Sequence, residues 1–193
     1  MLYDISQEVL SSSVWPGDPA PRLEPLGRMA GGAVCNLSGL SMCVHNGTHI
    51  DAPFHFYREG DTVERMPLAA FVGDCYLSRH RGDVTAEDAA AILEQAEAAG
   101  AAKRILLGGC LTVTAEAARV FAKAGIWLLG NESQTVGPED GPMEVHLILL
   151  GARVALLEGI VLTDIPQGKY FLSAAPLKLA GSDGAPCRAW IMG

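Results

Sequence analysis

The sequence has few positive charges. Lys and Arg together number 14 against 22 Asp and Glu, so the formal net charge of the 193-residue chain is −8. A nucleic-acid-binding protein needs a basic face that neutralises phosphates, and a protein that docks on anionic lipid needs clusters of Lys and Arg near that surface. The charge balance therefore argues against nucleic acid and membranes as partners.

Long apolar runs and paired cysteines are also missing. The chain begins MLYDISQEVL, which has neither the basic start nor the apolar stretch of a secretory signal. No apolar run approaches the roughly 20 residues of a membrane span. The five cysteines are odd in number, and no two have CxxC spacing. We interpret them as buried free thiols, and we expect a cytoplasmic protein.

Apolar strand patterns alternate with helix patterns from Gly73 onward. Thr85 is a candidate cap of a helix that ends at Gly100, and Gly125 is a candidate end of another. We expect strands at 75–78, 104–107, 126–129 and 154–157, and helices at 85–100, 115–124 and 142–151. This order predicts an α/β fold with a mainly parallel or mixed sheet. Residues 1–70 lack helical periodicity, which predicts a β-rich layer packed on the α/β part, and no linker divides 1–193 into two domains.

Three of the five histidines lie within eleven residues, in the segment His45-Asn-Gly-Thr-His-Ile-Asp-Ala-Pro-Phe-His55. Imidazole and carboxylate groups are the ligands that Zn²⁺, Mn²⁺ and similar ions prefer. Two histidines in a core beside a capping Asp, or a purely structural metal site, are the alternatives. Both are disfavoured, because burying so many polar groups unpaired is costly and structural zinc sites are usually rich in thiolates. The segment therefore predicts a catalytic metal site.

The spacing of these residues indicates a bent segment. Positions 45, 49, 51 and 55 share one parity, so a strand would place their side chains on one side. A straight strand would hold His45 and Asp51 about 20 Å apart, however, whereas ligands of one ion lie about 2.0–2.2 Å from it. A helix fails as well, because it turns position 51 away from 45 and 49. Gly47 and Pro53 permit a bend, so we expect a bent strand and loop around the metal.

Two further candidate ligands lie far along the chain. His146 belongs to the predicted helix at 142–151, and Glu158 follows the apolar strand at 154–157. The carboxyl ends of parallel strands are where ligand sites of α/β folds gather. Each residue also has an ordinary interpretation, as a hydrogen-bonded core histidine and as an exposed glutamate at a strand end.

The histidine segment resembles the HxGTHxDxPxH signature of the cyclase family of metal-dependent hydrolases, which includes bacterial kynurenine formamidases and isatin hydrolases. Trp15-Pro-Gly-Asp18 is similar to the family's WPGD turn, and Leu157-Glu-Gly159 is similar to its EGL segment. Leu111-Thr with Glu116-Ala-Ala118, and the stretch from His146 to Leu150, resemble further family segments. The resemblance therefore extends over nearly the whole chain.

The resemblance implies a swivelling β/β/α fold with a mixed sheet, a small-molecule substrate and a homodimer or homotetramer. It implies that one metal is held by His45, His49 and Asp51. A second metal would lie among Asp51, His55, His146 and Glu158, or these would act as proton-transfer groups beside a single ion. Zn²⁺ is favoured and Mn²⁺ is the alternative, at one or two ions per chain.

The resemblance favours hydrolysis of a small, aromatic amide such as an N-formyl arylamine, with lactam hydrolysis, cyclase-type dehydration and a catalytically silent binding module as alternatives. His55 is the first candidate for proton transfer and Glu158 the second. Trp15 is either an apolar wall for an aromatic substrate or a packed loop anchor. The chain departs from the family at Gly108-Gly-Cys110 and at Asn131-Glu-Ser-Gln-Thr-Val136, two segments expected near the pocket. No GxSxG nucleophile motif is present.

Overall fold

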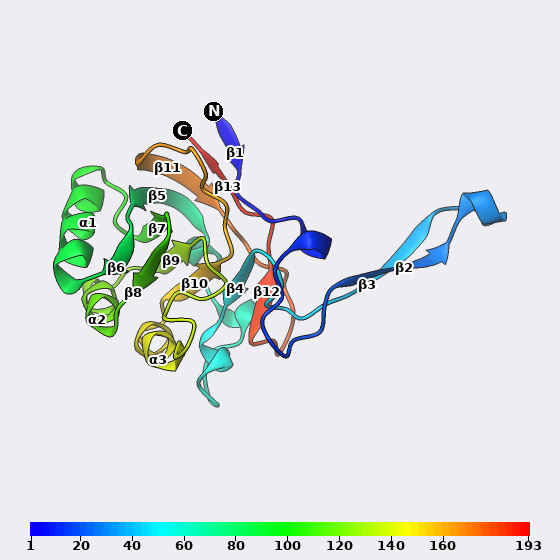
Figure 1. Cartoon of the computed structure of the whole chain (residues 1–193), viewed down its shortest axis with the longest axis horizontal. Coiled ribbons are helices and arrows are strands. Elements are labelled where there is room, and N and C mark those ends of the chain that lie inside the picture. Colours follow the sequence, from blue (N-terminus) through cyan, green and yellow to red (C-terminus); the bar gives the residue numbers. More distant parts are fainter.

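A mixed sheet of nine strands forms the centre of the computed structural model, which describes residues 1–193 (Figure 1). Its strands are β1 (Leu2–Asp4), β4 (His49–Asp51), β5 (Val72–Arg79), β7 (Arg104–Gly108), β9 (Leu128–Asn131), β10 (Ala155–Glu158), β11 (Gly168–Ser173), β12 (Gly184–Pro186) and β13 (Trp190–Met192). They are ordered β1-β13-β11-β5-β7-β9-β10-β4-β12. The central strands β5, β7, β9 and β10 run parallel, and the outer pairs are antiparallel. The predicted α/β fold with a mixed sheet is confirmed.

Three helices cover one face of this sheet (Figure 1). They are α1 (Ala86–Ala98), α2 (Ala115–Ala124) and α3 (Met143–Gly151). Thr85 caps α1 in a reciprocal pair with Asp88, and Gly125 ends α2 in the left-handed conformation at φ +63°. All three predicted helices are therefore confirmed. None of the helices combines the length and the hydrophobicity that a bilayer crossing needs.

The sheet separates two apolar cores. A cluster of 22 buried residues lies between the sheet and the helices, and a cluster of 20 lies on the opposite face. Alternate residues of β7 show this division, because Ile105 and Leu107 join the first cluster and Leu106 joins the second. Both faces of the parallel strands are thus buried, as a parallel sheet requires.

The N-terminal part of the chain differs from the prediction. Strands β1 and β4 join the central sheet, so no separate β-rich layer packs on the α/β part. The strands β2 (Arg22–Gly27) and β3 (Leu37–Ser41) instead pair only with each other, in a hairpin that projects from the body (Figure 1). Its apolar side chains are exposed rather than packed on the sheet. A further short pair, β6 (Gly82–Val84) with β8 (Leu111–Val113), lies beside the helices.

The cysteines are free, as predicted, but their burial differs from the prediction. Only Cys75 is buried, and Cys35 and Cys110 are exposed. Cys35 lies near the tip of the projecting hairpin, where no second layer covers it.

Candidate metal centre

The pairing of β4 with β10 places three of the candidate ligands on one face of the sheet. In this antiparallel pair His49 is the direct partner of Glu158, and Asp51 is the partner of Leu156. His49 and Asp51 are two residues apart, so both point to the side of the sheet where the helices lie, while Ile50 enters the opposite core. Glu158 stands at the carboxyl end of a parallel strand, where the sequence predicted a ligand site.

The bends on either side of β4 bring the remaining motif histidines back toward the site. Gly47 has φ +66°, a conformation that favours glycine, and it lies between His45 and the strand. Pro53 begins a 3₁₀ helix that ends at His55. The segment is therefore a short strand between two bends, as predicted.

Thr48 anchors this segment to the strand that carries Glu158. Its hydroxyl donates a hydrogen bond to the carbonyl oxygen of Gly159 over 2.6 Å and accepts one from the backbone N–H of Gln7 over 2.8 Å. The Gly-Thr pair of the motif thus has a structural reason, because it ties the His45–His49 turn to the end of β10.

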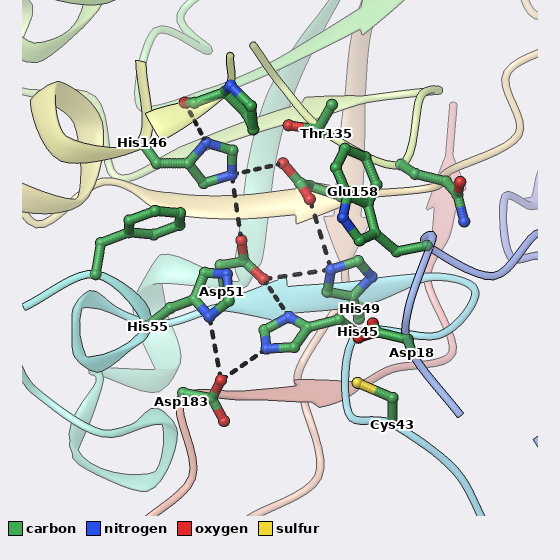
Figure 2. Close-up of a pocket in the computed structure, with 14 residues that line it drawn as sticks. Asp18, Cys43, His45, His49, Asp51, His55, Thr135, His146, Glu158 and Asp183 are labelled. Carbon is green, nitrogen blue, oxygen red and sulfur yellow. Dashed lines mark hydrogen bonds and ion pairs between the residues drawn. The ribbon is translucent and has the colours of Figure 1, made fainter. Parts of the chain in front are cut away.

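Helix α3 supplies His146. Val145, Leu149 and Leu150 pack into the core beneath α3, and this packing directs His146 toward the end of β10. Its Nε2 lies 3.3 Å from Oε1 of Glu158 and 3.6 Å from Oδ2 of Asp51 (Figure 2). The structure therefore brings His146 and Glu158 to the histidine motif, from about 90 residues further along the chain.

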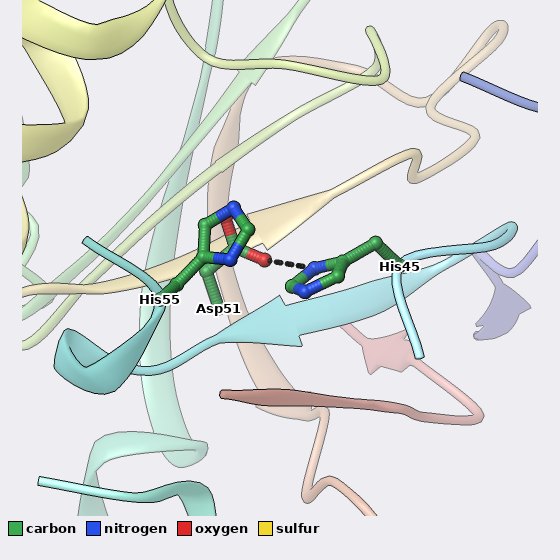
Figure 3. A group of neighbouring side chains, drawn as sticks. All are labelled: His45, Asp51 and His55. Carbon is green, nitrogen blue, oxygen red and sulfur yellow. Dashed lines mark hydrogen bonds and ion pairs between the residues drawn. The ribbon is translucent and has the colours of Figure 1, made fainter. Parts of the chain in front are cut away.

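The other three histidines surround Asp51 from the opposite side. Nε2 of His49 lies 3.2 Å from Oδ1 of Asp51 and 3.5 Å from Oε2 of Glu158, and Nδ1 of His45 lies 2.8 Å from Oδ1 of Asp51. His55 stands next to them at the mouth of the site (Figure 3). Two sets of side chains each bring their potential ligand atoms within 4.8 Å of one another, and both sets include Asp51. The first is His45, Asp51 and His55, and the second is His49, Asp51 and Glu158.

This arrangement of atoms fits a divalent metal ion. Two donor atoms that lie about 2.0–2.2 Å from a tetrahedral ion stand about 3.3–3.6 Å apart, and the contacts of His49 and His146 with the carboxylates lie close to this range. Backbone carbonyl oxygens hold the other ring nitrogens, since Nδ1 of His49 lies 3.0 Å from Gly47 O and Nδ1 of His146 lies 2.8 Å from Pro142 O. An Nδ1–H donor leaves the Nε2 lone pair free for a metal.

The charges of the site also favour a cation. No Lys or Arg is among the residues that line it, so its carboxylates have no neighbours with a fixed positive charge. Burial alone would lower the pKa values of His49 and His146, but Asp51 and Glu158 outweigh it and raise both to about 10. Burial would likewise raise the pKa of Asp51, yet its neighbouring histidines hold it well below the ordinary value. The ligand nitrogens therefore attract protons strongly, and a metal must compete with those protons.

These side chains open into a cavity of about 390 Å³. Such a volume suits a small molecule. Among the residues that line it are all those that the sequence proposed for the site: Trp15, His45, His49, Asp51, His55, His146 and Glu158. All the residues that the sequence nominated for metal, proton transfer or substrate contact thus meet in one place.

Comparison with known proteins places this site in a family. The model of the family described as putative cyclase matches residues 3–138. The chain belongs to the cyclase family. It is 33% identical to a kynurenine formamidase of Erythrobacter litoralis, over 97% of this chain and 92% of that protein.

Two solved structures share the cyclase fold over almost their full length. One is described as a potential metal-dependent hydrolase with cyclase activity. It is 30% identical, covers 99% of this chain and 96% of its own, and superposes with a TM-score of 0.83. The other is isatin hydrolase A from Labrenzia aggregata bound to benzyl benzoate. It is 22% identical, covers 100% of this chain and 93% of its own, and has a TM-score of 0.84.

The cavity of this cyclase-family chain has further walls beyond the residues that the sequence proposed for metal, proton transfer or substrate contact. They are Asp18, Cys43, Phe56, Gln134, Thr135, Pro142 and Asp183. Gln134 and Thr135 belong to the segment that departs from the family pattern, so that departure does border the cavity, whereas Gly108 and Gly109 line a different depression. Cys43 also lines the cavity, although it lies two residues before His45 and outside the ligand motif. Asp183 could not be recognised as a site residue from the sequence, because an acidic residue before glycine is common in turns.

Proposed function

We propose that the chain is a metal-dependent hydrolase of a small aromatic amide, with N-formyl arylamines as the first candidate substrates. The observation that supports this proposal is the buried cluster of imidazoles and carboxylates at the floor of a cavity of about 390 Å³. The similarity to a kynurenine formamidase over 97% of the chain supports amide hydrolysis as the reaction. In this reaction water adds to the carbonyl carbon, the C–N bond breaks, and the leaving nitrogen receives a proton.

His45, His49 and Asp51 would hold one ion, and Asp51 with His146 and Glu158 offers ligands for a second. Zn²⁺ is the favoured ion because imidazole and carboxylate suit it, and Mn²⁺ is the alternative. A divalent ion bound there supplies a nucleophile at neutral pH and polarises the carbonyl oxygen of an amide. The protein fixes the ligands through the Gly47 and Pro142 carbonyl oxygens described above.

The proton-transfer group in this proposal is His55. Its side chain is 28% exposed, the highest value among the four histidines of the site, so it can contact both a substrate and water. Nδ1 makes the only hydrogen bond of the ring, which leaves Nε2 free. Glu158 is the second candidate, but it is 3% exposed and already accepts a hydrogen bond from the backbone N–H of Val136 over 2.7 Å.

Aromatic substrates fit the walls of the cavity. Trp15 and Phe56 both line it, and the Trp15 loop is tied to the neighbouring segment because Nε2 of Gln134 donates to Ser13 O over 2.6 Å. Thr135 is 4% exposed and its hydroxyl has no hydrogen-bond partner. We propose that Trp15 contacts the ring of the substrate and that Thr135 offers a hydrogen bond to its polar part.

The proposal predicts metal-dependent hydrolysis. The purified protein should contain one or two transition-metal ions per chain by elemental analysis, and it should hydrolyse N-formyl arylamines. Removal of the metal with a chelator should abolish turnover, and Zn²⁺ or Mn²⁺ should restore it, because the nucleophile depends on the ion.

Two results would contradict parts of this prediction. If the protein holds no metal even after reconstitution, the prediction of a metal site is wrong. If the metal-loaded protein opens a lactam ring such as that of isatin but leaves N-formyl arylamines intact, the reaction is amide hydrolysis and the linear substrate class is wrong. A metal-loaded protein inactive on both classes would favour a binding module.

We infer that the chain forms a homodimer or homotetramer in which a second copy covers the β2–β3 hairpin. Leu23, Leu26, Leu37 and Leu40 of this hairpin are between 52% and 62% exposed, and the hairpin makes no sheet contact with its own body. An isolated two-stranded hairpin is marginally stable in water.

The five free thiols support a reducing, cytoplasmic location for the protein.

The L23S/L40S double variant is expected to weaken this assembly. The two leucines are direct cross-strand partners. Burying each is worth roughly 1.5–3 kcal/mol, so the Kd for self-association should rise at least about 100-fold. Analytical ultracentrifugation measures the change, and V34S is the control, because Val34 is a 98% exposed residue at the hairpin tip. A wild-type protein that is monomeric at micromolar concentration would refute the inference.

A further inference from the structure

Asp183 contacts two histidines of the site through a single oxygen. Its Oδ2 lies 2.8 Å from Nε2 of His45 and 3.1 Å from Nδ1 of His55 (Figure 2). The side chain of Asp183 is 39% exposed, and it stands on the opposite side of these rings from Asp51. A carboxylate between two imidazoles can influence both, although neither the motif spacing nor the family resemblance nominated it.

The backbone around Asp183 fixes its position relative to His45. Asp183 directly precedes β12, in which Gly184 is the pairing partner of Asp51, and its carbonyl oxygen accepts a hydrogen bond from Ala52 N–H over 2.9 Å. A Cβ atom on Gly184 would lie 2.6 Å from Ile50 O and 2.8 Å from Cε1 of His45. Glycine is therefore required at this position, because the His45 ring packs directly against the backbone beside Asp183.

The contacts determine which ring nitrogens carry protons. A carboxylate is ionised at neutral pH and only accepts hydrogen bonds, so a neutral imidazole that faces it must present an N–H. Nε2 of His45 and Nδ1 of His55 are then the protonated nitrogens. Nε2 of His55 has no partner and keeps its lone pair. Nδ1 of His45 faces a second carboxylate, Asp51 Oδ1, over 2.8 Å, so without a metal it presents an N–H as well, and a metal that binds between His45 and Asp51 would replace that proton.

We propose that Asp183 is a positioning residue that fixes the tautomers of His45 and His55 at once. In the metal-loaded site it would hold the remaining proton of His45 on Nε2, so that Nδ1 binds the metal, and it leaves Nε2 of His55 free to accept a proton from the cavity, roles that rest on the proposed function. His49 and His146 have the assignment opposite to that of His45, since backbone carbonyl oxygens hold their Nδ1 atoms. The site thus uses Nε2 for two ligands and Nδ1 for His45, and only the latter depends on a side chain.

The test compares D183A and D183N with the wild-type protein, all loaded with Zn²⁺. Long-range ¹H–¹⁵N spectra of the labelled histidines report which ring nitrogen carries the proton. The wild type should show Nε2–H for His45 and Nδ1–H for His55, and D183A should show a mixture for His55. Chelator competition should show zinc affinity about 10–100-fold lower in D183A, the usual cost of losing a partner that orients a ligand.

D18N is the matched control, because Asp18 is a second carboxylate of the same cavity that hydrogen-bonds no histidine. It should leave the tautomers unchanged. D183N is nearly isosteric with the wild type, so it tests the same contact even if D183A fails to fold. Opposite tautomers in the wild type, or tautomers and zinc affinity unchanged in both Asp183 variants, would overturn this inference alone. A wild-type protein that binds no zinc would instead overturn the proposed function.

Discussion

Replacing His49 by alanine is expected to remove both the metal and the activity. His49 is 2% exposed, and its Nε2 lies within 3.5 Å of oxygens of both Asp51 and Glu158. The variant loses one of the three ligands proposed for the first ion, and with it the imidazole between these two carboxylates. Metal polarisation of a carbonyl is worth several kcal/mol, and each 1.36 kcal/mol changes the rate tenfold. The kcat/KM for an N-formyl arylamine should therefore fall by at least about 10³.

H80A is the matched control for this experiment. His80 is the one histidine of five that does not line the cavity, and its Nε2 lies 3.0 Å from the carbonyl oxygen of Asp83. The control makes the same chemical change outside the site, so metal content and turnover should match those of the wild type. Circular dichroism of H49A checks that the fold persists. An H49A protein that is folded and holds the full complement of metal would show that His49 is not a ligand.

The helices and central strands were predictable because local signals act alone there. Thr85 and Gly125 mark helix ends by their own chemistry, and the structure places both as expected. Strand β9 is less well predicted, since it spans Leu128–Asn131 rather than 126–129. Ile126 is buried but does not pair, so hydrophobicity at that point reports burial and not strand register.

The site was predictable where its residues are crowded in sequence. The motif from His45 to His55 has a spacing that only a bent segment satisfies, and β4 with its two bends provides it. His146 and Glu158 needed the family resemblance, because a core histidine and a strand-end glutamate look the same without a partner. Asp183 could not be found in this way. Its place depends on the pairing of β12 with β4, which joins segments about 130 residues apart.

The projecting hairpin was not predictable for a different reason. It carries four leucines, at 23, 26, 37 and 40, and a group of apolar side chains of this kind indicates burial against something. Hydrophobicity does not distinguish the chain's own sheet from a second copy. The predicted layer was assigned to the former, and in the structure the leucines find no partner on their own body.

Replacing His55 by alanine is expected to slow the chemical step while the protein keeps at least one metal ion. In the proposed site His45, His49 and Asp51 would supply the three protein ligands that an open catalytic site typically has, so His55 would not be needed to hold that ion. General acid–base help by a positioned side chain is typically worth about 10²–10⁴ in rate. The kcat of H55A for an N-formyl arylamine should fall by that factor.

The same variant distinguishes proton transfer from metal binding, because two quantities are measured on one sample. Elemental analysis gives the metal content of H55A, and steady-state kinetics at saturating metal gives kcat. A low kcat with one ion still bound supports proton transfer through Nε2 of His55, the nitrogen left free by the contact of Nδ1 with Asp183. A near wild-type kcat would assign the transfer to Glu158 instead. Complete loss of metal would show that His55 is itself a ligand, because a group that only moves protons leaves the ion in place when it is removed.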